Sequence, residues 1–340
     1  MTSVESLTIL FAGKEVVELR SLPGPDPGPG EVLVRTTKTL ISTGTECICY
    51  AHLVEPGTNW DRMVQYPMAA GYSHAGVVEA VGEGVTDLSP GGRVASFHSH
   101  RQFACGPAEG FLPVPEGITD EEATFYALAT VAQNAIRKAE HELGDTVVVV
   151  GLGILGQLVA QYARLLGARE VIAVDLSEAR LEMAAGHGAS ATLCMGADAA
   201  REPVAELTGG RLADVVYDVT GSPAAFAPVQ RLARRFGRLI LLGDTGTPSE
   251  QRLVNDFLWR GLRVIGAFSG DPPPDETDHH YWTRKNMARL FFDYLRNGQM
   301  RVSDLITHRF HPQEAGEVYR MLLQDRGATV GVVFDWTEPC

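Results

Sequence analysis

Two patterns of apolar and polar positions divide the chain near residue 120. Before this point, short apolar runs such as residues 31–36 and 76–81 are broken by Pro and Gly, which predicts an irregular, mostly β domain. After it, an Ala-rich stretch as far as His141 predicts helices. Thr119 followed by Glu122 has the spacing of a capping box at the start of this helical stretch.

Downstream of the helical stretch, strands and helices alternate. Residues 147–150 are four consecutive valines, which is typical of a strand buried on both faces. Helical spacing follows from Ile154 until Gly167, and Ser177 is placed to cap the next helix. This alternation predicts an α/β fold with a doubly wound parallel sheet of the Rossmann type. Six strands are expected, at residues 147–150, 170–175, 191–195, 214–220, 238–243 and 263–268.

The alternation stops after residue 268. Residues 271–275 read Asp-Pro-Pro-Pro-Asp and are expected to form a loop, and a helix is expected over 282–296. The strand-like run 329–334 is expected to return to the first domain. We therefore assign residues 1–121 and 269–340 to the mostly β domain. Residues 122–268 form the Rossmann domain.

Length and charge limit the class of protein. A chain of 340 residues favours two domains, and 45% hydrophobic residues are enough for sizeable cores. A formal net charge of −13 argues against binding to nucleic acid or to anionic membrane surfaces. No apolar run approaches the length of a bilayer span, and the first residues lack the pattern of a signal peptide. The five cysteines are irregularly spaced, so we expect a cytoplasmic protein without disulfides.

A glycine motif directly follows the valine strand and opens the next helix. Gly151 allows a tight turn, Gly153 lets the backbone approach a pyrophosphate, and Gly156 lets the helix pack on the strand. The N–H groups of Ile154 and Leu155, in the first turn of that helix, would face the phosphate charge. Strand, motif and helix in this order predict a dinucleotide site.

An acidic residue ends the second strand of the same domain. Asp175 stands at the position where an acidic residue accepts hydrogen bonds from the adenosine ribose hydroxyls. A carboxylate at this position repels a 2′-phosphate. NAD is therefore expected rather than NADP. Leu176 and Arg180 follow it and are expected near the ribose. Ends of later strands should border the same nucleotide, at Thr220, Gly243, Asp244, Phe268 and Ser269, with the last two near the nicotinamide.

The chain resembles the medium-chain dehydrogenase/reductases over nearly its whole length. The resemblance rests on residues 29–35, 75–82 and 90–94 and on the nucleotide motif. It implies a GroES-like catalytic domain, a Rossmann domain and an active site in the cleft between them. It also implies a homodimer or homotetramer that acts on a small-molecule substrate.

Zinc members of this family hold a catalytic metal with three side chains. At those positions this chain has Ser42, Tyr72 and Ala127, and such groups do not hold Zn²⁺. The family's structural zinc needs four closely spaced Cys, but residues 92–115 offer only Cys105. The Ser-Thr-Gly-Thr-Glu stretch at residues 42–46, the Gly-Tyr-Ser stretch at 71–73 and residues 305–309 resemble a smaller zinc-less branch of the superfamily, which is similar to the bacteriochlorophyllide dehydrogenases.

A new metal site is the alternative to a metal-free enzyme. It would have to be formed by Glu46 together with histidines; Cys47 and Cys49 alternate like a strand or loop and are expected to pack rather than to bind metal. The histidines concerned are His74, His98 and His100.

Without zinc, protein groups must stabilise the alkoxide and move its proton. Thr45 aligns with the hydroxyl that relays the proton in the zinc enzymes, and Tyr72 occupies a former ligand position. Glu46 is expected to anchor its neighbours rather than to act as a base. Histidine titrates near neutral pH, so the candidate bases are His74 and His100, followed by His98.

These observations favour an NAD-dependent oxidoreductase that acts on a secondary alcohol or ketone, such as a polyol, cyclitol or sugar-like metabolite. One alternative is a zinc-less ene reductase of the quinone oxidoreductase kind, although those enzymes commonly use NADPH. A second is a redox-neutral epimerase or eliminase that uses bound NAD transiently. A non-enzymatic dinucleotide sensor or structural protein is the third.

Overall fold

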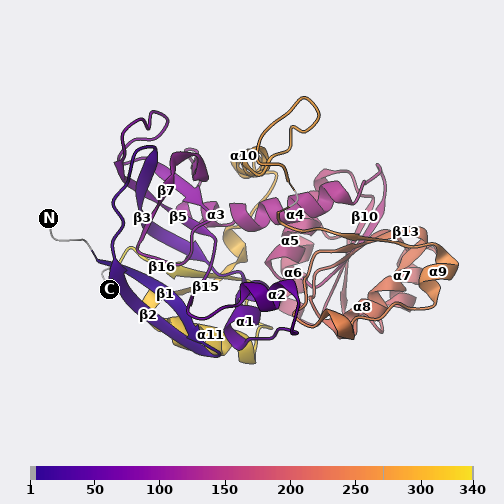
Figure 1. The fold of residues 1–340 in the computed structure, drawn as a ribbon. Helices are drawn as coiled ribbons and strands as arrows, with labels where there is room; N and C mark the ends of the chain where they lie inside the picture. The colour runs from indigo at the N-terminus through magenta and orange to yellow at the C-terminus, as the bar shows by residue number, and fades with distance from the viewer. Residues whose placement is uncertain (1–4, 271, 339–340) are drawn as a thin grey trace. The chain divides into compact units, whose positions relative to one another are not determined.

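The chain folds as two compact units, each with its own sheets (Figure 1). The computed structural model describes residues 5–270 and 272–338. The β unit comprises Met1–Leu128, Ala288–Gly298 and Val302–Cys340, and the Rossmann unit comprises Ala129–Met287 and Gln299–Arg301. Two of these limits fall inside helices, α4 (Tyr126–Lys138) and α10 (Arg284–Arg296), whereas the boundaries assigned from sequence stood outside them.

The Rossmann unit contains the six-stranded parallel sheet that the sequence predicts. Its central strand is buried at every position because four valines supply apolar side chains to both faces. The order reverses at this strand, as in a doubly wound fold. In sheet order the strands are β11 (Ala191–Cys194), β10 (Glu170–Asp175), β9 (Thr146–Val150), β12 (Ala213–Asp218), β13 (Ala233–Leu241) and β14 (Arg263–Gly266).

Helices follow the strands of this sheet. Helix α5 (Ile154–Leu165) starts directly after the glycine motif, and the chain turns at Gly167, where φ is +85°. The predicted cap of α6 (Glu178–Gly186) is confirmed, because the Ser177 side chain accepts a hydrogen bond from the Arg180 N–H. The other helices of this unit are α7 (Arg201–Leu207), α8 (Pro223–Gln230) and α9 (Asp256–Arg260).

The β unit is built on a seven-stranded sheet and a smaller three-stranded one. The predicted strands near residues 31, 76 and 92 are confirmed. The larger sheet consists of β15 (Ile306–Phe310), β16 (Gly331–Asp335), β3 (Glu31–Leu40), β5 (His74–Val81), β6 (Arg93–Ser96) and β8 (Phe111–Pro113), with β7 (Phe103–Pro107) paired to β3. The smaller sheet consists of β2 (Val16–Pro23), β1 (Glu5–Gly13) and β4 (Met68–Ala69).

The C-terminal strand returns to the first part of the chain, as predicted. Strand β16 pairs antiparallel with β3, with Val333 opposite Leu40. The preceding helix α11 (Ala315–Gln324), yellow in Figure 1, lies against the indigo strand β2 and against α1 (Thr43–Ala51). The core formed here includes Phe11, Tyr319 and Phe334.

The strand or loop expected at Cys47 and Cys49 is wrong, because both lie in helix α1. The alternating positions of the two cysteines suggested a strand or loop because the helix lacks a single buried face. Helix α1 is short and is covered by α11 as well as by the sheet, so several of its faces are buried. Their expected packing role is confirmed: both side chains are in the core, and burial raises the pKa of Cys47 to about 11 and that of Cys49 to about 12.

The Ala-rich stretch after residue 120 forms α3 (Asp120–Thr124) and α4, and its capping box is confirmed. Thr119 Oγ1 accepts from the Glu122 N–H at 3.2 Å, and Glu122 Oε2 accepts from the Thr119 N–H at 2.9 Å. Asp271 lies outside the described residues, and the remainder of the Pro-rich segment is a loop, as expected. A short helix, α2 (Asn59–Met63), completes the set of α-helices in the described residues.

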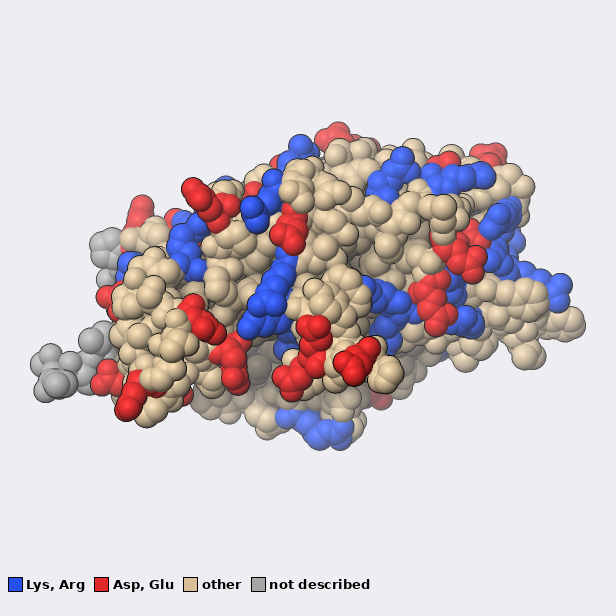
Figure 2. Space-filling model, turned by 90° about the horizontal axis from the view of Figure 1, so that it is seen from above, with Lys and Arg blue, Asp and Glu red and all other residues tan. Residues whose placement is uncertain are grey.

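The surface and the helices add two facts about the class of protein. Figure 2 shows basic and acidic side chains interspersed over one face, in a chain of net charge −13. Among the described residues, none of the helices has the length and apolar character needed to cross a membrane.

Candidate functional site

The glycine motif forms the turn between β9 and α5. Gly151 has φ +93°, and a Cβ on Gly156 would lie 2.0 Å from the Gly151 carbonyl oxygen. A Cβ on Gly153 would meet nothing within 4 Å. Gly151 and Gly156 are therefore required by the fold itself, whereas Gly153 leaves open space beside the first turn of α5. This is the approach that a pyrophosphate needs, so the loop fits a dinucleotide.

Asp175 lies beside this loop at the end of β10. Its Oδ2 accepts from the Leu152 N–H at 2.6 Å, and its Oδ1 accepts from the Ser177 N–H at 2.9 Å. The Arg180 guanidinium is 3.8 Å from Oδ2. Leu176 is 78% exposed. The structure thus brings Asp175 and Arg180 to the glycine loop, where the sequence placed the ribose.

The segment after β12 also reaches this loop, and the segment after β13 packs against the segment after β12. A Cβ on Gly151 would lie 3.2 Å from Thr220, and a Cβ on Gly243 would lie 2.5 Å from the Gly221 nitrogen. The backbone of residues 220–221 therefore packs directly on residues 243–244. Sequence reasoning missed Asp218, whose Oδ1 accepts from the Thr220 N–H and hydroxyl, and whose pKa is raised by burial.

Phe268 and Ser269 lie beyond the end of β14, which is shorter than predicted. The Phe268 carbonyl accepts from Asn134 Nδ2 at 2.9 Å, and the Ser269 carbonyl accepts from Arg284 Nη2 at 2.9 Å. These bonds hold the backbone, while the Phe268 side chain is 69% exposed.

In the β unit, two of the former zinc-ligand positions come together. Tyr72 Oη donates a hydrogen bond to Ser42 Oγ at 2.6 Å. Burial raises the pKa of the Tyr72 phenol, and hydrogen bonding with the Ser42 and Thr45 hydroxyls offsets only part of this rise. Tyr72 is therefore a neutral phenol at physiological pH, and the three side chains form a cluster of hydroxyl groups.

Aromatic rings border this hydroxyl cluster. The Tyr72 ring stacks on Phe97 with centroids 6.4 Å apart, and Phe97 meets Tyr126 edge-on at 5.1 Å. Ala127, at the third former ligand position, is completely buried in α4. Two neutral hydroxyls and a methyl group do not fit Zn²⁺. Within residues 5–270 and 272–338, no three His, Cys, Asp or Glu side chains are grouped as a metal ion would require.

His74, a candidate base from the sequence, is a core residue. It has no exposed surface; its Nε2 is 2.9 Å from Thr36 Oγ1 and its Nδ1 is 2.8 Å from Ser96 Oγ. Burial, with smaller contributions from His98 and Arg101, holds its pKa well below the usual range. Because β5 begins at His74 and turns it inward, both nitrogens are occupied and neither is available to a substrate.

His100 and Glu46 meet in a second buried cluster. His100 Nε2 lies 2.9 Å from Glu46 Oε2, and Tyr319 Oη donates to the same oxygen at 2.5 Å. Glu46 Oε1 accepts from the Ser42 N–H at 2.7 Å. Both His100 and Glu46 are almost inaccessible to solvent, which agrees with the anchoring role expected for Glu46 rather than with direct contact to substrate. Sequence reasoning missed Tyr319, since no local motif marks it.

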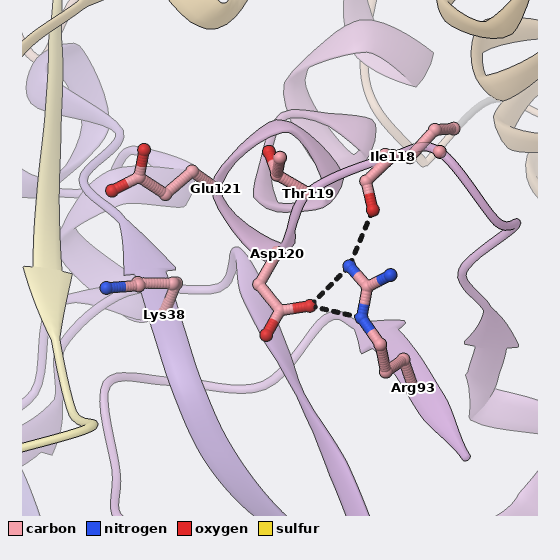
Figure 3. Close-up of a pocket in the computed structure, with 7 residues that line it drawn as sticks. Lys38, Arg93, Ile118, Thr119, Asp120 and Glu121 are labelled. Atoms are coloured by element: carbon pink, nitrogen blue, oxygen red, sulfur yellow. Dashed lines mark hydrogen bonds and ion pairs between the residues drawn. The ribbon is translucent and has the colours of Figure 1, made fainter.

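An open pocket of about 680 Å³ lies elsewhere in the β unit, beside α3 (Figure 3). Its charged side chains are already paired: Arg93 with Asp120, Lys38 with Asp335, and Glu121 with Arg309. The lining residues include none of the sequence-predicted site residues, so this pocket is not the candidate site.

Comparison with known proteins covers both units. Residues 28–140 match the alcohol dehydrogenase GroES-like domain, and residues 155–283 match the zinc-binding dehydrogenase family model. Human sorbitol dehydrogenase is 26% identical over 96% of this chain and 95% of its own length.

Two solved structures show the same fold. An Escherichia coli oxidoreductase/dehydrogenase of unknown specificity superposes with a TM-score of 0.82 at 19% identity, covering 98% of this chain and 99% of that one. A protein from Escherichia coli CFT073, described as a short chain alcohol dehydrogenase complexed with NADH, gives 0.79 at 20% identity, covering 97% and 99%. The chain is an alcohol dehydrogenase-like oxidoreductase and belongs to the medium-chain dehydrogenase/reductase superfamily.

Proposed function

We propose that this protein transfers a hydride between NAD and a secondary alcohol or ketone without a catalytic zinc ion. The observation that carries the proposal is the 2.6 Å hydrogen bond between Tyr72 and Ser42, at two positions where zinc ligands stand in the family. Sorbitol dehydrogenase among the relatives supports a polyol or similar secondary alcohol as substrate.

The Rossmann unit would hold the dinucleotide. The glycine loop leaves open space at Gly153, and the first N–H groups of α5 would bind the pyrophosphate there. A carboxylate has about four lone-pair sites, and backbone N–H groups use two of those on Asp175, which leaves two for the ribose hydroxyls. A 2′-phosphate would meet this negative charge, which supports NAD over NADP.

The hydroxyl cluster would stabilise the substrate oxygen. When bound, the nicotinamide supplies or accepts the hydride. In ketone reduction, negative charge develops on the carbonyl oxygen, and hydroxyl donors lower the energy of that state. Ser42 Oγ gives its proton to the new alkoxide, and Tyr72 Oη, which already donates to Ser42 Oγ, replaces that proton. Tyr72 Oη must then regain a proton from solvent before the next turnover. Alcohol oxidation runs the same steps in reverse.

A substrate panel combined with metal analysis tests this proposal. We expect NADH formation from NAD⁺ with at least one polyol, cyclitol or other secondary alcohol, in a preparation with less than stoichiometric zinc. Chelation should leave that turnover intact, and kcat/KM should be higher with NAD⁺ than with NADP⁺. Stoichiometric zinc lost together with activity would contradict the metal-free mechanism. Activity on enones alone, or bound NAD that never exchanges, would contradict the reaction class.

A preference for NADP of about tenfold or more would show that Asp175 has been misread. The variant Asp175→Ala tests this cofactor preference directly. It should weaken NAD binding and narrow the difference in affinity between NAD and NADP. The substitution removes both the acceptor for the ribose hydroxyls and the negative charge that repels a 2′-phosphate. Dissociation constants for both dinucleotides, measured on the wild type and the variant, provide this check.

A further inference from the structure

Glu46, His100 and Tyr319 form a buried polar network in the β unit that does not itself contact the proposed substrate oxygen. They come from α1, from the segment after β6, and from α11. Glu46 is 2% exposed and accepts three hydrogen bonds, from the Ser42 N–H, His100 Nε2 and Tyr319 Oη. A buried carboxylate is tolerated only when it is hydrogen-bonded in this way.

The direction of the bond from Tyr319 is well defined. Burial, together with the nearby Glu46 carboxylate, raises the pKa of Tyr319 well above its usual value. The phenol is therefore protonated and donates to Glu46 Oε2. Its ring is fixed by packing, since it meets Phe11 edge-on with centroids 4.9 Å apart.

Glu46 changes what Ser42 can do. Ser42 is the N-cap residue of α1. The hydroxyl of an N-cap serine usually accepts a hydrogen bond from a backbone N–H of the first helical turn. Here the Ser42 side chain makes no such bond. Instead, the Ser42 N–H donates to Glu46 Oε1, and the Ser42 carbonyl accepts from the Glu46 N–H at 2.9 Å. The backbone of Ser42 is thus held at both ends, and its hydroxyl is left for Tyr72.

His100 fixes the other side of the hydroxyl pair. The backbone N–H of His100 donates a hydrogen bond to the Ala70 carbonyl at 2.8 Å. Gly71 follows with φ +82°, and a Cβ there would lie 2.3 Å from His100 Nε2. The imidazole therefore packs directly on the residue before Tyr72, while the same nitrogen bonds Glu46. One network contacts both segments that carry the hydroxyls.

We propose that Glu46, His100 and Tyr319 are positioning residues that set the Ser42–Tyr72 hydroxyl pair. This inference rests on the proposed function, because it assigns the network an effect on turnover. Small displacements of a catalytic group are costly, and about 1 Å can lower the rate by roughly 10²-fold. Loss of one bond to Glu46 should therefore reduce kcat while leaving KM for NAD unchanged.

The test is a double-mutant cycle between Tyr319→Phe and Tyr72→Phe. Tyr319→Phe keeps the packed ring and removes one bond to Glu46; we expect kcat to fall about tenfold. In the Tyr72→Phe background the same change should have little further effect, since the hydroxyl pair is already lost. Glu46→Gln is the second variant, and Tyr50→Phe, a tyrosine of the same core outside the network, is the matched control. Thermal unfolding of each variant is measured separately.

The outcomes separate this inference from the proposed function. If Tyr72→Phe alone retains full turnover, the proposed site is in the wrong place. If Tyr72→Phe is impaired but Tyr319→Phe and Glu46→Gln keep wild-type kcat, only the positioning role is overturned. The same follows if Tyr319→Phe lowers kcat equally in both backgrounds, or if Tyr50→Phe lowers kcat as much as Tyr319→Phe. A coupled loss of kcat confined to the network supports the inference.

Discussion

His74 shows how the surroundings of a residue decide whether it can act in chemistry. In water an imidazole titrates near neutral pH and is a natural candidate base. Here Thr36 and Ser96 occupy both ring nitrogens, and the ring has no exposed surface. The residue type alone suggests proton transfer. In the fold, burial keeps the imidazole of His74 neutral, and its two hydrogen bonds connect β3 with β6.

The burial of His74 predicts a loss of stability in acid. Its folded-state pKa is depressed, so the unfolded chain binds more protons below about pH 6.5. The contribution of His74 to the free energy of unfolding is therefore fully present above about pH 6.5. Below that pH it is lost as pH decreases, by up to about 1.4 kcal/mol per pH unit for one such group. His98 and His141 are shifted in the same direction.

Denaturant unfolding of the wild type and His74→Gln between pH 7.5 and 5, as an approximate window, measures this effect. The variant should be less stable at neutral pH, but its stability should depend less steeply on pH. His279→Gln, at an exposed position, is the control and should retain the wild-type slope. Equal slopes for wild type and His74→Gln would contradict the account.

The cofactor residues could be predicted from sequence, and the buried networks could not. Gly151, Gly153, Gly156 and Asp175 are within 25 positions of one another, and a strand followed by a helix brings them together locally. The Glu46–Tyr319 contact joins residues 273 positions apart and depends on how α11 packs on α1. No spacing in the sequence encodes such a contact.

At the scale of elements, runs of β-branched residues made the Rossmann unit predictable. Strands β9, β10 and β12 were placed within a few residues, because a strand buried on both faces is continuously apolar. Strand β13 begins at Ala233 rather than at Arg238, and the edge strands β11 and β14 are only partly buried. The strands β1 and β2 were not predicted; β2 escapes the pattern because it is largely exposed and mixes charged with apolar residues. Helix α1 was misread because burial from several sides removes its amphipathic period.

The strand–helix junction of β9 and α5 gives a matched pair of glycine variants. Gly156→Ala places a methyl group 2.0 Å from the Gly151 carbonyl oxygen and should destabilise the protein by about 1–3 kcal/mol. Gly153→Ala has open space, and the backbone at Gly153 (φ −66°, ψ −170°) is an extended conformation that alanine adopts without strain, so stability should be largely kept. Its methyl group would occupy the approach to the loop, and NAD affinity should fall about tenfold or more.

Calorimetric titration with NAD, alongside thermal unfolding, checks both glycine variants. Gly13→Ala is the control for glycine replacement in itself, because a Cβ there meets only Val16 at 3.8 Å. Unchanged NAD affinity in a folded Gly153→Ala variant would show that the dinucleotide does not approach at this turn.

At the scale of the whole molecule, the edge of the Rossmann sheet is suited to association with a second copy. Strand β14 ends the sheet and pairs within the described chain only with β13. Nearby in sequence, Leu258 and Trp259 of α9 are 81% and 76% exposed. An open edge strand beside exposed apolar side chains favours pairing and otherwise invites aggregation.

We predict a homodimer or homotetramer. Light scattering at micromolar concentration should give at least twice the mass of the 36.7 kDa chain. Ile265→Lys, in the edge strand, should shift the equilibrium toward monomer, whereas Leu143→Lys, at another exposed apolar position, should not. A wild-type monomer would rule out this assembly.

The central claim is that hydroxyl groups do the work assigned to zinc in other members of the superfamily, and Tyr72→Phe tests it most directly. The measurement is steady-state turnover of the metal-free enzyme, with NAD affinity determined separately. We predict a loss of roughly 10²-fold in kcat with unchanged NAD affinity, because one well-placed polar group is removed from the β unit while the dinucleotide loop is untouched. Tyr66→Phe, which removes a hydroxyl bonded to the Cys49 carbonyl, should remain near wild type. Near-native turnover of Tyr72→Phe, or an equal loss in Tyr66→Phe, would contradict the account.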